Sequence, residues 1–157
     1  MLSVHEVMTL RPVTVTRQAT IGELMGEFDR HDFNALPVVD AGDVLVGIVT
    51  KLDVLRALRP APDLDLRGVQ TIAGAPVEGI MRRGVVTVEP EDPVAVAADL
   101  MVETRLRSLP VVQRSPGAGR VLVGIVSQGD LLRGFRFALA NERMAAGLEA
   151  PVGAEAR

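Results

Sequence analysis

The sequence predicts an α/β (α+β) fold made of two copies of one β-α-β-β-α unit. Three observations support this prediction: the chain contains an internal repeat, each copy carries two β-branched runs, and helical periodicity flanks those runs. A chain of 157 residues with 48% hydrophobic residues can bury one sizeable core, or two small cores that share an interface. The repeat therefore decides the fold.

The repeat consists of two aligned blocks. Residues 4–39 match residues 77–112 at a shift of 73 positions, and residues 44–59 match residues 121–136 at a shift of 77. Together the blocks contain nineteen identical pairs. The change of shift places a four-residue insertion within residues 114–120, where Ser115-Pro116-Gly117 predicts a loop.

The first copy predicts a strand, a helix, a hairpin and a second helix. Thr20 begins the first helix, with Glu23 three residues later in a capping-box pattern. Apolar residues then recur at spacings of three and four, so one face of this helix must pack on the rest of the fold. The predicted elements are a strand at 12–15, a helix from Thr20, strands at 36–39 and 44–49 joined by a turn at 40–43, and a helix from Thr50 to about Arg59.

The second copy repeats this order. Asp92 is the predicted N-cap of its first helix, with Pro93 at the first helical position. Its strands are predicted at 85–88, 109–112 and 121–126, and its second helix follows Ser127. The predicted organisation is a first repeat at 1–59, a connector at 60–74, a second repeat at 75–136, and a C-terminal helical extension and tail at 137–157.

Composition excludes several classes of function. A net charge of −3 and 3% aromatic residues, with no Trp or Tyr, argue against nucleic-acid binding. The absence of cysteine excludes disulfides and thiolate zinc sites, and His5 and His31 lie in different elements, so neither a metal site nor a catalytic residue is predicted. We therefore expect no enzyme activity. The apolar runs are too short to span a membrane and no signal peptide is evident, so a cytoplasmic location is expected.

Two strings in each copy resemble a known family. Leu36-Pro37-Val38-Val39 and Leu109-Pro110-Val111-Val112 precede the strings that run from Gly47 to Asp53 and from Gly124 to Asp130, which read G-I-V-[ST]-x-x-D. The pattern, over about residues 3–136, resembles a tandem pair of CBS domains, a Bateman module, here as a stand-alone CBS-domain protein. The resemblance implies two repeats packed by their sheets around a pseudo-two-fold axis, two clefts that bind adenosyl ligands, and a homodimer.

The candidate binding residues gather where a strand turns into a helix. Thr50 and Ser127 stand at helix N-termini, where backbone N–H groups and the helix dipole favour an anion. The resemblance implies that Asp53 and Asp130 accept ribose hydroxyls. It also assigns the adenine slot to Leu10, Pro12 and Val13 with Ala35 and Pro37, or to Gly84, Val85 and Val86 with Ser108 and Pro110.

The Thr50-x-x-Asp53 and Ser127-x-x-Asp130 strings have a second interpretation. Each is also a helix capping box, in which the hydroxyl and the carboxylate satisfy the N–H groups of the helix itself. Arg107 stands where the family often places a basic residue against phosphate, so the Ser127 site ranks ahead for phosphorylated ligands. Lys51 is a weaker phosphate candidate in the first copy.

These observations lead to a regulatory hypothesis. The chain is expected to bind AMP, ADP or ATP, with NAD or S-adenosylmethionine as further candidates, and to require no cofactor or metal. Binding would change its conformation, and a separate enzyme or transporter would respond. The alternative is a structural or protein-interaction module, a homodimer scaffold without a ligand.

Overall fold

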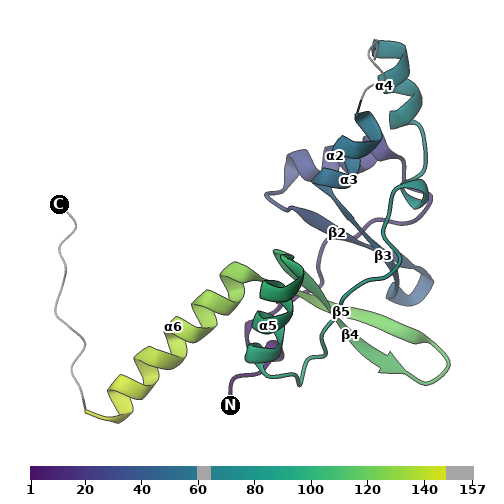
Figure 1. The fold of residues 1–157 in the computed structure, drawn as a ribbon. Helices are drawn as coiled ribbons and strands as arrows, with labels where there is room; N and C mark the ends of the chain where they lie inside the picture. The colour runs from purple at the N-terminus through teal and green to yellow at the C-terminus, as the bar shows by residue number, and fades with distance from the viewer. Residues whose placement is uncertain (60–64, 148–157) are drawn as a thin grey trace, which may run out of the picture.

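The computed structural model describes residues 1–59 and 65–147 and has the predicted mixture of helices and antiparallel strands (Figure 1). Its strands are β1 (Thr9–Leu10), β2 (Ala35–Asp40), β3 (Val44–Thr50), β4 (Ser108–Ser115) and β5 (Gly119–Ser127). Its α-helices are α1 (Val4–Val7), α2 (Ile21–Arg30), α3 (Lys51–Leu58), α4 (Leu66–Ala73), α5 (Val94–Thr104) and α6 (Gln128–Ala145). Short 3₁₀ turns lie at η1 (Ala41–Asp43) and η2 (Val77–Gly79). In the described residues the strand order is β1-β5-β3-β2, with β4 paired to β5.

Both predicted hairpins are confirmed. Strands β2 and β3 pair in antiparallel register around the turn η1, in which Gly42 adopts a left-handed φ of 72° that glycine accepts without steric cost. Strands β4 and β5 form the equivalent hairpin. The insertion predicted as a loop mainly lengthens this second hairpin, because Arg114 pairs with Arg120 and Ser115 with Gly119. The two hairpins meet at a single pair, Val44 opposite Val121.

The predicted strands at 12–15 and 85–88 are wrong, because each forms only one isolated parallel bridge. Val15 pairs with Val38, and Val88 pairs with Val111. The Val15 N–H donates to the Pro37 carbonyl at 3.1 Å, and the Val88 N–H donates to the Pro110 carbonyl at 3.1 Å. Proline has no N–H to donate to the next carbonyl along, so the ladder cannot extend.

The helix starts are confirmed except at α5. Helix α2 has the predicted capping box between Thr20 and Glu23. Helix α5 begins one residue later than predicted, at Val94, with Pro93 in an extended conformation as its N-cap. The Asp92 carboxylate accepts a hydrogen bond from the Glu89 N–H at 2.8 Å instead of capping α5. The connector also contains helix α4, which the sequence did not predict, and α6 continues past residue 136 as expected.

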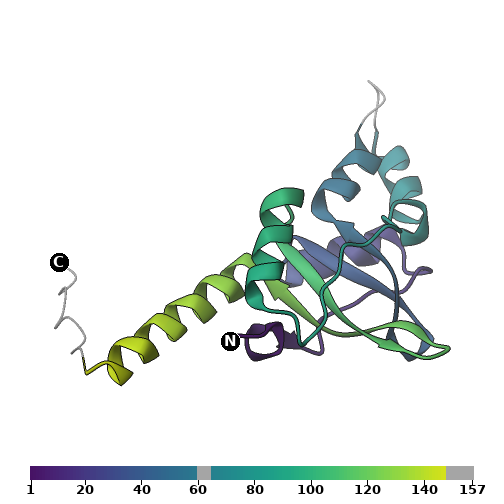
Figure 2. The same cartoon turned by 60° about the horizontal axis from the view of Figure 1, so that its bottom comes forward.

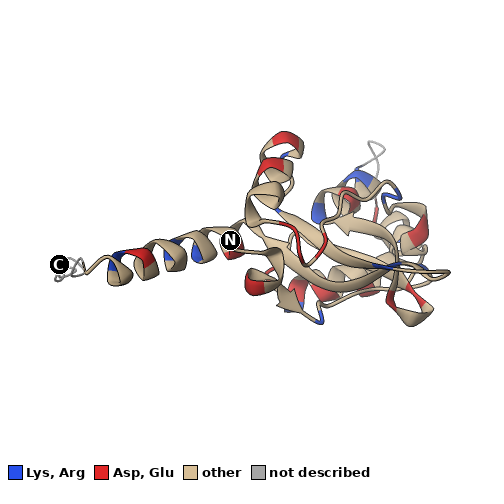
Figure 3. Cartoon of the chain, turned by 90° about the horizontal axis from the view of Figure 1, so that it is seen from below, with Lys and Arg blue, Asp and Glu red and all other residues tan. Residues whose placement is uncertain are grey.

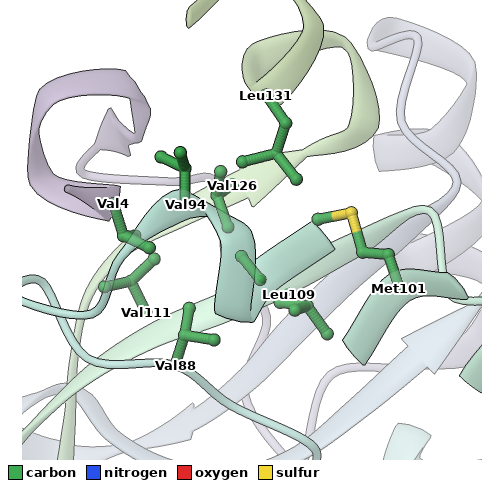
Figure 4. Close-up of a cluster of buried hydrophobic side chains, with 9 residues drawn as sticks. Val4, Val88, Val94, Met101, Leu109, Val111, Val126 and Leu131 are labelled. Carbon is green, nitrogen blue, oxygen red and sulfur yellow. The ribbon is translucent and has the colours of Figure 1, made fainter. Parts of the chain in front are cut away.

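The N-terminal segments of the two repeats, here called lead-in segments, exchange places. The first lead-in segment (residues 2–10) packs in the core of the second repeat, where Val4 is fully buried beside Val88, Val94 and Val111 (Figure 4). The second lead-in segment (residues 75–83) packs in the core of the first repeat through Val77 and Met81. Burying a side chain such as Val4 stabilises a fold by about 1.5–3 kcal/mol, so each repeat depends on the other for part of its core.

Backbone hydrogen bonds repeat this exchange with two-fold symmetry. The Val4 N–H donates to the Asp92 carbonyl at 2.8 Å, and the equivalent Val77 N–H donates to the Ala19 carbonyl at 2.8 Å. Thr9 and Leu10 pair with β5, while their counterpart Arg82 bridges to Ile48 of β3. The symmetric pattern supports the expected pseudo-two-fold axis between the repeats.

A glycine in each G-I-V string makes the exchange sterically possible. A Cβ atom on Gly47 would lie 2.7 Å from the Met81 Sδ and 3.0 Å from the Arg82 carbonyl oxygen. A Cβ atom on Gly124 would lie 2.9 Å from both the Met8 Sδ and the Thr9 carbonyl oxygen. Only glycine lets the lead-in backbone approach this closely.

A third apolar cluster joins the repeats between their hairpins. It combines residues of β2 and β3 with residues of β4 and β5, and it includes Val85 from the segment before α5. Its buried members are Val39, Leu45, Ile48, Val85, Val112 and Leu122. The expected packing of the repeats through their strands is thereby confirmed.

We predict that Gly124→Ala destabilises the fold by about 1–3 kcal/mol, because the added methyl group meets the backbone of Thr9 and forces the lead-in segment outward. Urea unfolding of both proteins measures the difference. Gly79→Ala is the matched control, since nothing lies within 4 Å of its added Cβ, and its effect should stay within about 0.5 kcal/mol. An equal loss of unfolding free energy in the two variants would contradict the steric explanation.

Candidate functional site

Two clefts lie between the repeats. The Thr50 cleft, of about 720 Å³, is lined by Thr50 and the start of α3 from the first repeat and by Gly84, Val85 and Val86 from the second. The Ser127 cleft, of about 350 Å³, is lined by Ser127 and Asp130 from the second repeat and by Pro12 and Val13 from the first. Ala35 and Ser108 line both clefts. Each cleft is therefore built by both repeats.

The exchange of lead-in segments explains which residues meet. The sequence grouped Pro12 and Val13 with Ala35 of the same repeat, and Gly84 to Val86 with Ser108 of the same repeat. In the structure, Pro12 and Val13 follow β1, which pairs with β5, so they reach the Ser127 cleft. Residues 84–86 follow Arg82, which bridges to β3, so they reach the Thr50 cleft. The sequence found these residues but not their crossed pairing.

Four of the predicted site residues lie outside the lining of both clefts. Leu10 lies in β1 and is 60% exposed. Pro37 and Pro110 are buried, and their carbonyl oxygens accept the hydrogen bonds from Val15 and Val88. Asp53, the fourth, lies beneath the surface of the Thr50 cleft and is 6% exposed.

Asp53 is held by hydrogen bonds on both carboxylate oxygens. Its Oδ2 accepts from the Thr50 N–H and from the Thr50 hydroxyl, each at 2.9 Å, and its own N–H donates to the Thr50 Oγ1 at 3.1 Å. Its Oδ1 accepts from Arg82 Nε at 3.1 Å and from Arg56 at 3.4 Å. Arg82 belongs to the second lead-in segment, so Asp53 also ties the two repeats together.

Asp130 has the same local geometry without the link to the other repeat. Its Oδ2 accepts from the Ser127 N–H at 2.8 Å, and its N–H donates to the Ser127 hydroxyl at 3.1 Å. Its Oδ1 pairs with Arg133 on the exposed side of α6. Thr9 stands where the first cleft has Arg82, and a threonine supplies no cation. Asp130 lines its cleft, whereas Asp53 does not.

The capping interpretation is confirmed at both strings, because each forms a complete capping box. Capping occupies only part of each helix N-terminus. The Lys51 N–H donates to the Asn34 carbonyl at 3.0 Å, and the Gln128 N–H donates to the Arg107 carbonyl at 2.9 Å. Within the described chain no acceptor is found for the N–H groups of Leu52 and Gly129. Leu52 also lines the Thr50 cleft, so its N–H is a candidate donor to an anion there.

Arg107 lines both clefts. Its position therefore gives no reason to rank the Ser127 cleft ahead of the Thr50 cleft, contrary to the sequence argument. Sequence reasoning also missed four further cations, Arg11 in the Ser127 cleft and Arg56, Arg82 and Arg105 in the Thr50 cleft. An alignment of the two copies would have found both Arg11, which aligns with Gly84, and Arg82, which aligns with Thr9.

Within residues 1–59 and 65–147, no cluster of three or more His, Asp or Glu side chains is arranged to hold a metal ion. None of the helices in this part of the chain combines the length and the apolar character that crossing a bilayer requires.

The fold and its clefts define a class of protein, a two-repeat module whose clefts are lined by both repeats. The sequence model described as CBS domain matches residues 4–60 and 77–136. The chain belongs to the CBS domain family as a tandem pair. It is similar to the CBS domain-containing protein YhcV of Bacillus subtilis, with 36% identity over 131 residues that cover 83% of this chain and 84% of the relative.

Solved structures of CBS pairs have the same fold. The CBS domain pair of protein MJ0100, in complex with 5′-methylthioadenosine and S-adenosyl-L-methionine, is 30% identical, with a TM-score of 0.69 and coverage of 88% of this chain and 98% of that one. CBSX2 in complex with AMP is 27% identical, with a TM-score of 0.70 and coverage of 91% and 100%. The similarity extends over nearly the full length of both structures.

We predict that Asp53→Ala lowers the free energy of unfolding more than Asp130→Ala does, by about 2–3 kcal/mol against about 1–2 kcal/mol. Both variants lose a helix cap, but only Asp53 binds an arginine of the other repeat. Chemical denaturation measures both costs.

A double-mutant cycle with Arg82→Ala isolates this contact. We expect a coupling of about 0.5–1 kcal/mol, since Arg82 is half exposed. If the two aspartate variants lose the same unfolding free energy and Asp53 shows no coupling to Arg82, the contact between the repeats contributes nothing to stability.

Proposed function

We propose that this protein is a regulatory module that binds an adenosyl ligand in the clefts between its repeats and transmits binding as a change of conformation. One observation carries the proposal: each cleft combines the capped helix N-terminus of one repeat with the lead-in backbone of the other. The helix N-terminus suits phosphate or ribose oxygens. Apolar residues such as Val13 and Val85 suit the face of an adenine ring.

The similar structures support the choice of ligand. The MJ0100 pair holds two adenosyl compounds, and CBSX2 holds AMP. The candidate ligands are AMP, ADP and ATP, together with NAD and S-adenosylmethionine. The ribose hydroxyls are proposed to reach Asp130 in the Ser127 cleft, where one repeat alone holds the carboxylate. In the Thr50 cleft, Asp53 would first have to release Arg82.

The crossed construction supplies a means of signalling. A ligand that contacts both walls of a cleft has a different affinity for each relative position of the repeats, and only such a difference can shift a conformational equilibrium. Ala35, Ser108 and Arg107 line both clefts, so the two clefts adjoin the same part of the fold. We propose that a separate enzyme or transporter responds to this change and that the module itself catalyses no reaction.

We also propose that the protein acts as a homodimer through α6. Figures 1 and 2 show this helix projecting away from the rest of the described chain. Leu132 and Leu139 lie one heptad apart on one face of it and are 70% and 61% exposed. Figure 3 shows both acidic and basic residues along the projecting part. An antiparallel pair of helices centred on Leu139 would place Arg136 opposite Glu142 of a second copy, which is a complementary arrangement.

We predict that an adenosyl ligand raises the midpoint of thermal unfolding, because a ligand that binds only the folded state stabilises it by about 2.7 kcal/mol at 100 times its dissociation constant. The test is thermal unfolding with AMP, ADP, ATP, NAD and S-adenosylmethionine, each at millimolar concentration. Guanosine nucleotides are the matched control, because they carry the same ribose and phosphate groups with a different base. No shift with any compound would contradict the proposal and favour the alternative of an interaction module without a ligand.

For the dimer we predict that the double variant Leu132→Glu/Leu139→Glu sediments as a monomer while the wild-type protein sediments as a dimer. Charge on the shared face would oppose the pairing of two helices. Asn141→Glu is the control, because it adds charge to the opposite face of the same helix and should remain dimeric. A monomeric wild-type protein at micromolar concentration would refute this part of the proposal.

A further inference from the structure

The two clefts differ in charge. The Thr50 cleft is lined by five cationic side chains and by no acidic one, whereas the Ser127 cleft balances Arg11 and Arg107 against Asp32 and Asp130. The five cations of the Thr50 cleft are Lys51, Arg56, Arg82, Arg105 and Arg107. Charges concentrated in one cleft raise the local concentration of an oppositely charged ligand and strengthen its binding.

The difference arises at equivalent positions of the repeat. Arg82 in the Thr50 cleft corresponds to Thr9 in the Ser127 cleft. Arg105 corresponds to Asp32, which replaces a cation by an anion at the same place in the cleft wall. Lys51, at the start of α3, corresponds to the uncharged Gln128 at the start of α6. The repeats share their fold and their helix caps, so the difference in charge between the two clefts arises from substitutions at these equivalent positions.

Only part of the positive charge in the Thr50 cleft is neutralised by the protein. Arg82 and Arg56 both pair with the Asp53 carboxylate. Among the residues that the structure describes, no acidic partner lies within ion-pair distance of Lys51, Arg105 or Arg107. These three cations line the same cleft as Leu52, whose N–H has no acceptor in the described part of the chain. The arrangement suits a ligand with several negative charges.

We infer that the clefts are specialised by charge: the Thr50 cleft takes an adenosyl ligand with a polyphosphate chain, and the Ser127 cleft takes one with little or no negative charge. This inference rests on the proposed function and names the ligand class of each site. The cleft volumes support this inference, since the Thr50 cleft measures about 720 Å³ and the Ser127 cleft about 350 Å³. The larger cleft has room for a phosphate chain beside the nucleoside.

The backbone at Arg105 and Arg11 allows a clean test. Arg105 ends α5 with a left-handed φ of 58°, and Arg11 has a φ of 51°. Glycine adopts this conformation without steric cost. Arg105→Gly therefore removes a cation from the Thr50 cleft without adding strain, and Arg11→Gly is the matched change in the Ser127 cleft.

The two clefts can be monitored separately because the chain contains no Trp or Tyr. Leu52→Trp places a single fluorophore in the Thr50 cleft, and Phe33→Trp places one in the Ser127 cleft. Both positions are partly exposed, at 52% and 39%, so the larger side chain has room. Each reporter protein is titrated with ATP in the absence of divalent cations and, separately, with uncharged 5′-methylthioadenosine.

We expect ATP to quench the Leu52→Trp reporter at a concentration about tenfold lower than the Phe33→Trp reporter, because one additional charge-assisted contact changes affinity by about that factor. 5′-Methylthioadenosine should bind the Phe33→Trp reporter at least as tightly as the other. Arg105→Gly should weaken ATP at the Leu52→Trp reporter by about tenfold, while Arg11→Gly leaves it unchanged there.

Two results would overturn the inference in different ways. Equal ATP affinity at the two reporters, or equal effects of Arg105→Gly and Arg11→Gly on ATP binding in the Thr50 cleft, would show that the clefts are not specialised by charge, while the proposed function would stand. No response of either reporter to ATP or 5′-methylthioadenosine, together with no heat of binding to the wild-type protein in calorimetry, would refute the proposed function itself.

Discussion

The close approach of each lead-in segment to a glycine of the opposite hairpin is the constraint on which the rest of the structure depends. Met81 and the Arg82 carbonyl lie against Gly47, and Met8 and the Thr9 carbonyl lie against Gly124. These contacts bring Val4 into one core and Val77 into the other. Neither repeat completes its core alone, so the two repeats are expected to fold as one cooperative unit.

The same exchange produces the two clefts. Because the backbone after each lead-in segment continues across the opposite hairpin, it reaches the helix N-terminus of the other repeat and closes a cleft against it. The capping boxes at Thr50 and Ser127 have two effects. They fix the direction of α3 and α6, and among the described residues they leave one first-turn N–H in each helix without an acceptor. Helix capping and the proposed ligand contacts therefore involve the same few residues.

Much of the fold could be predicted from the sequence, because the repeat, the hairpin turns and the capping boxes are local patterns. The capping of α2 by Thr20 and of α3 by Thr50 depends on residues three positions apart, and both were predicted correctly. The crossing of the lead-in segments could not be predicted, since a shift between two copies says which residues are equivalent and not which copy they contact. The grouping of Arg82 with Lys51 in the Thr50 cleft was missed for the same reason: the two residues are far apart in sequence and line one cleft only because of the crossing.

The most direct test of the account is hydrogen–deuterium exchange of the wild-type protein with and without a saturating adenosyl ligand. If the clefts are shared, one ligand will protect amides from both repeats together, in residues 50–56 with 82–86 for the Thr50 cleft, or in residues 127–133 with 9–13 for the Ser127 cleft. Protection confined to segments of a single repeat would contradict the central claim that each binding site is built by both.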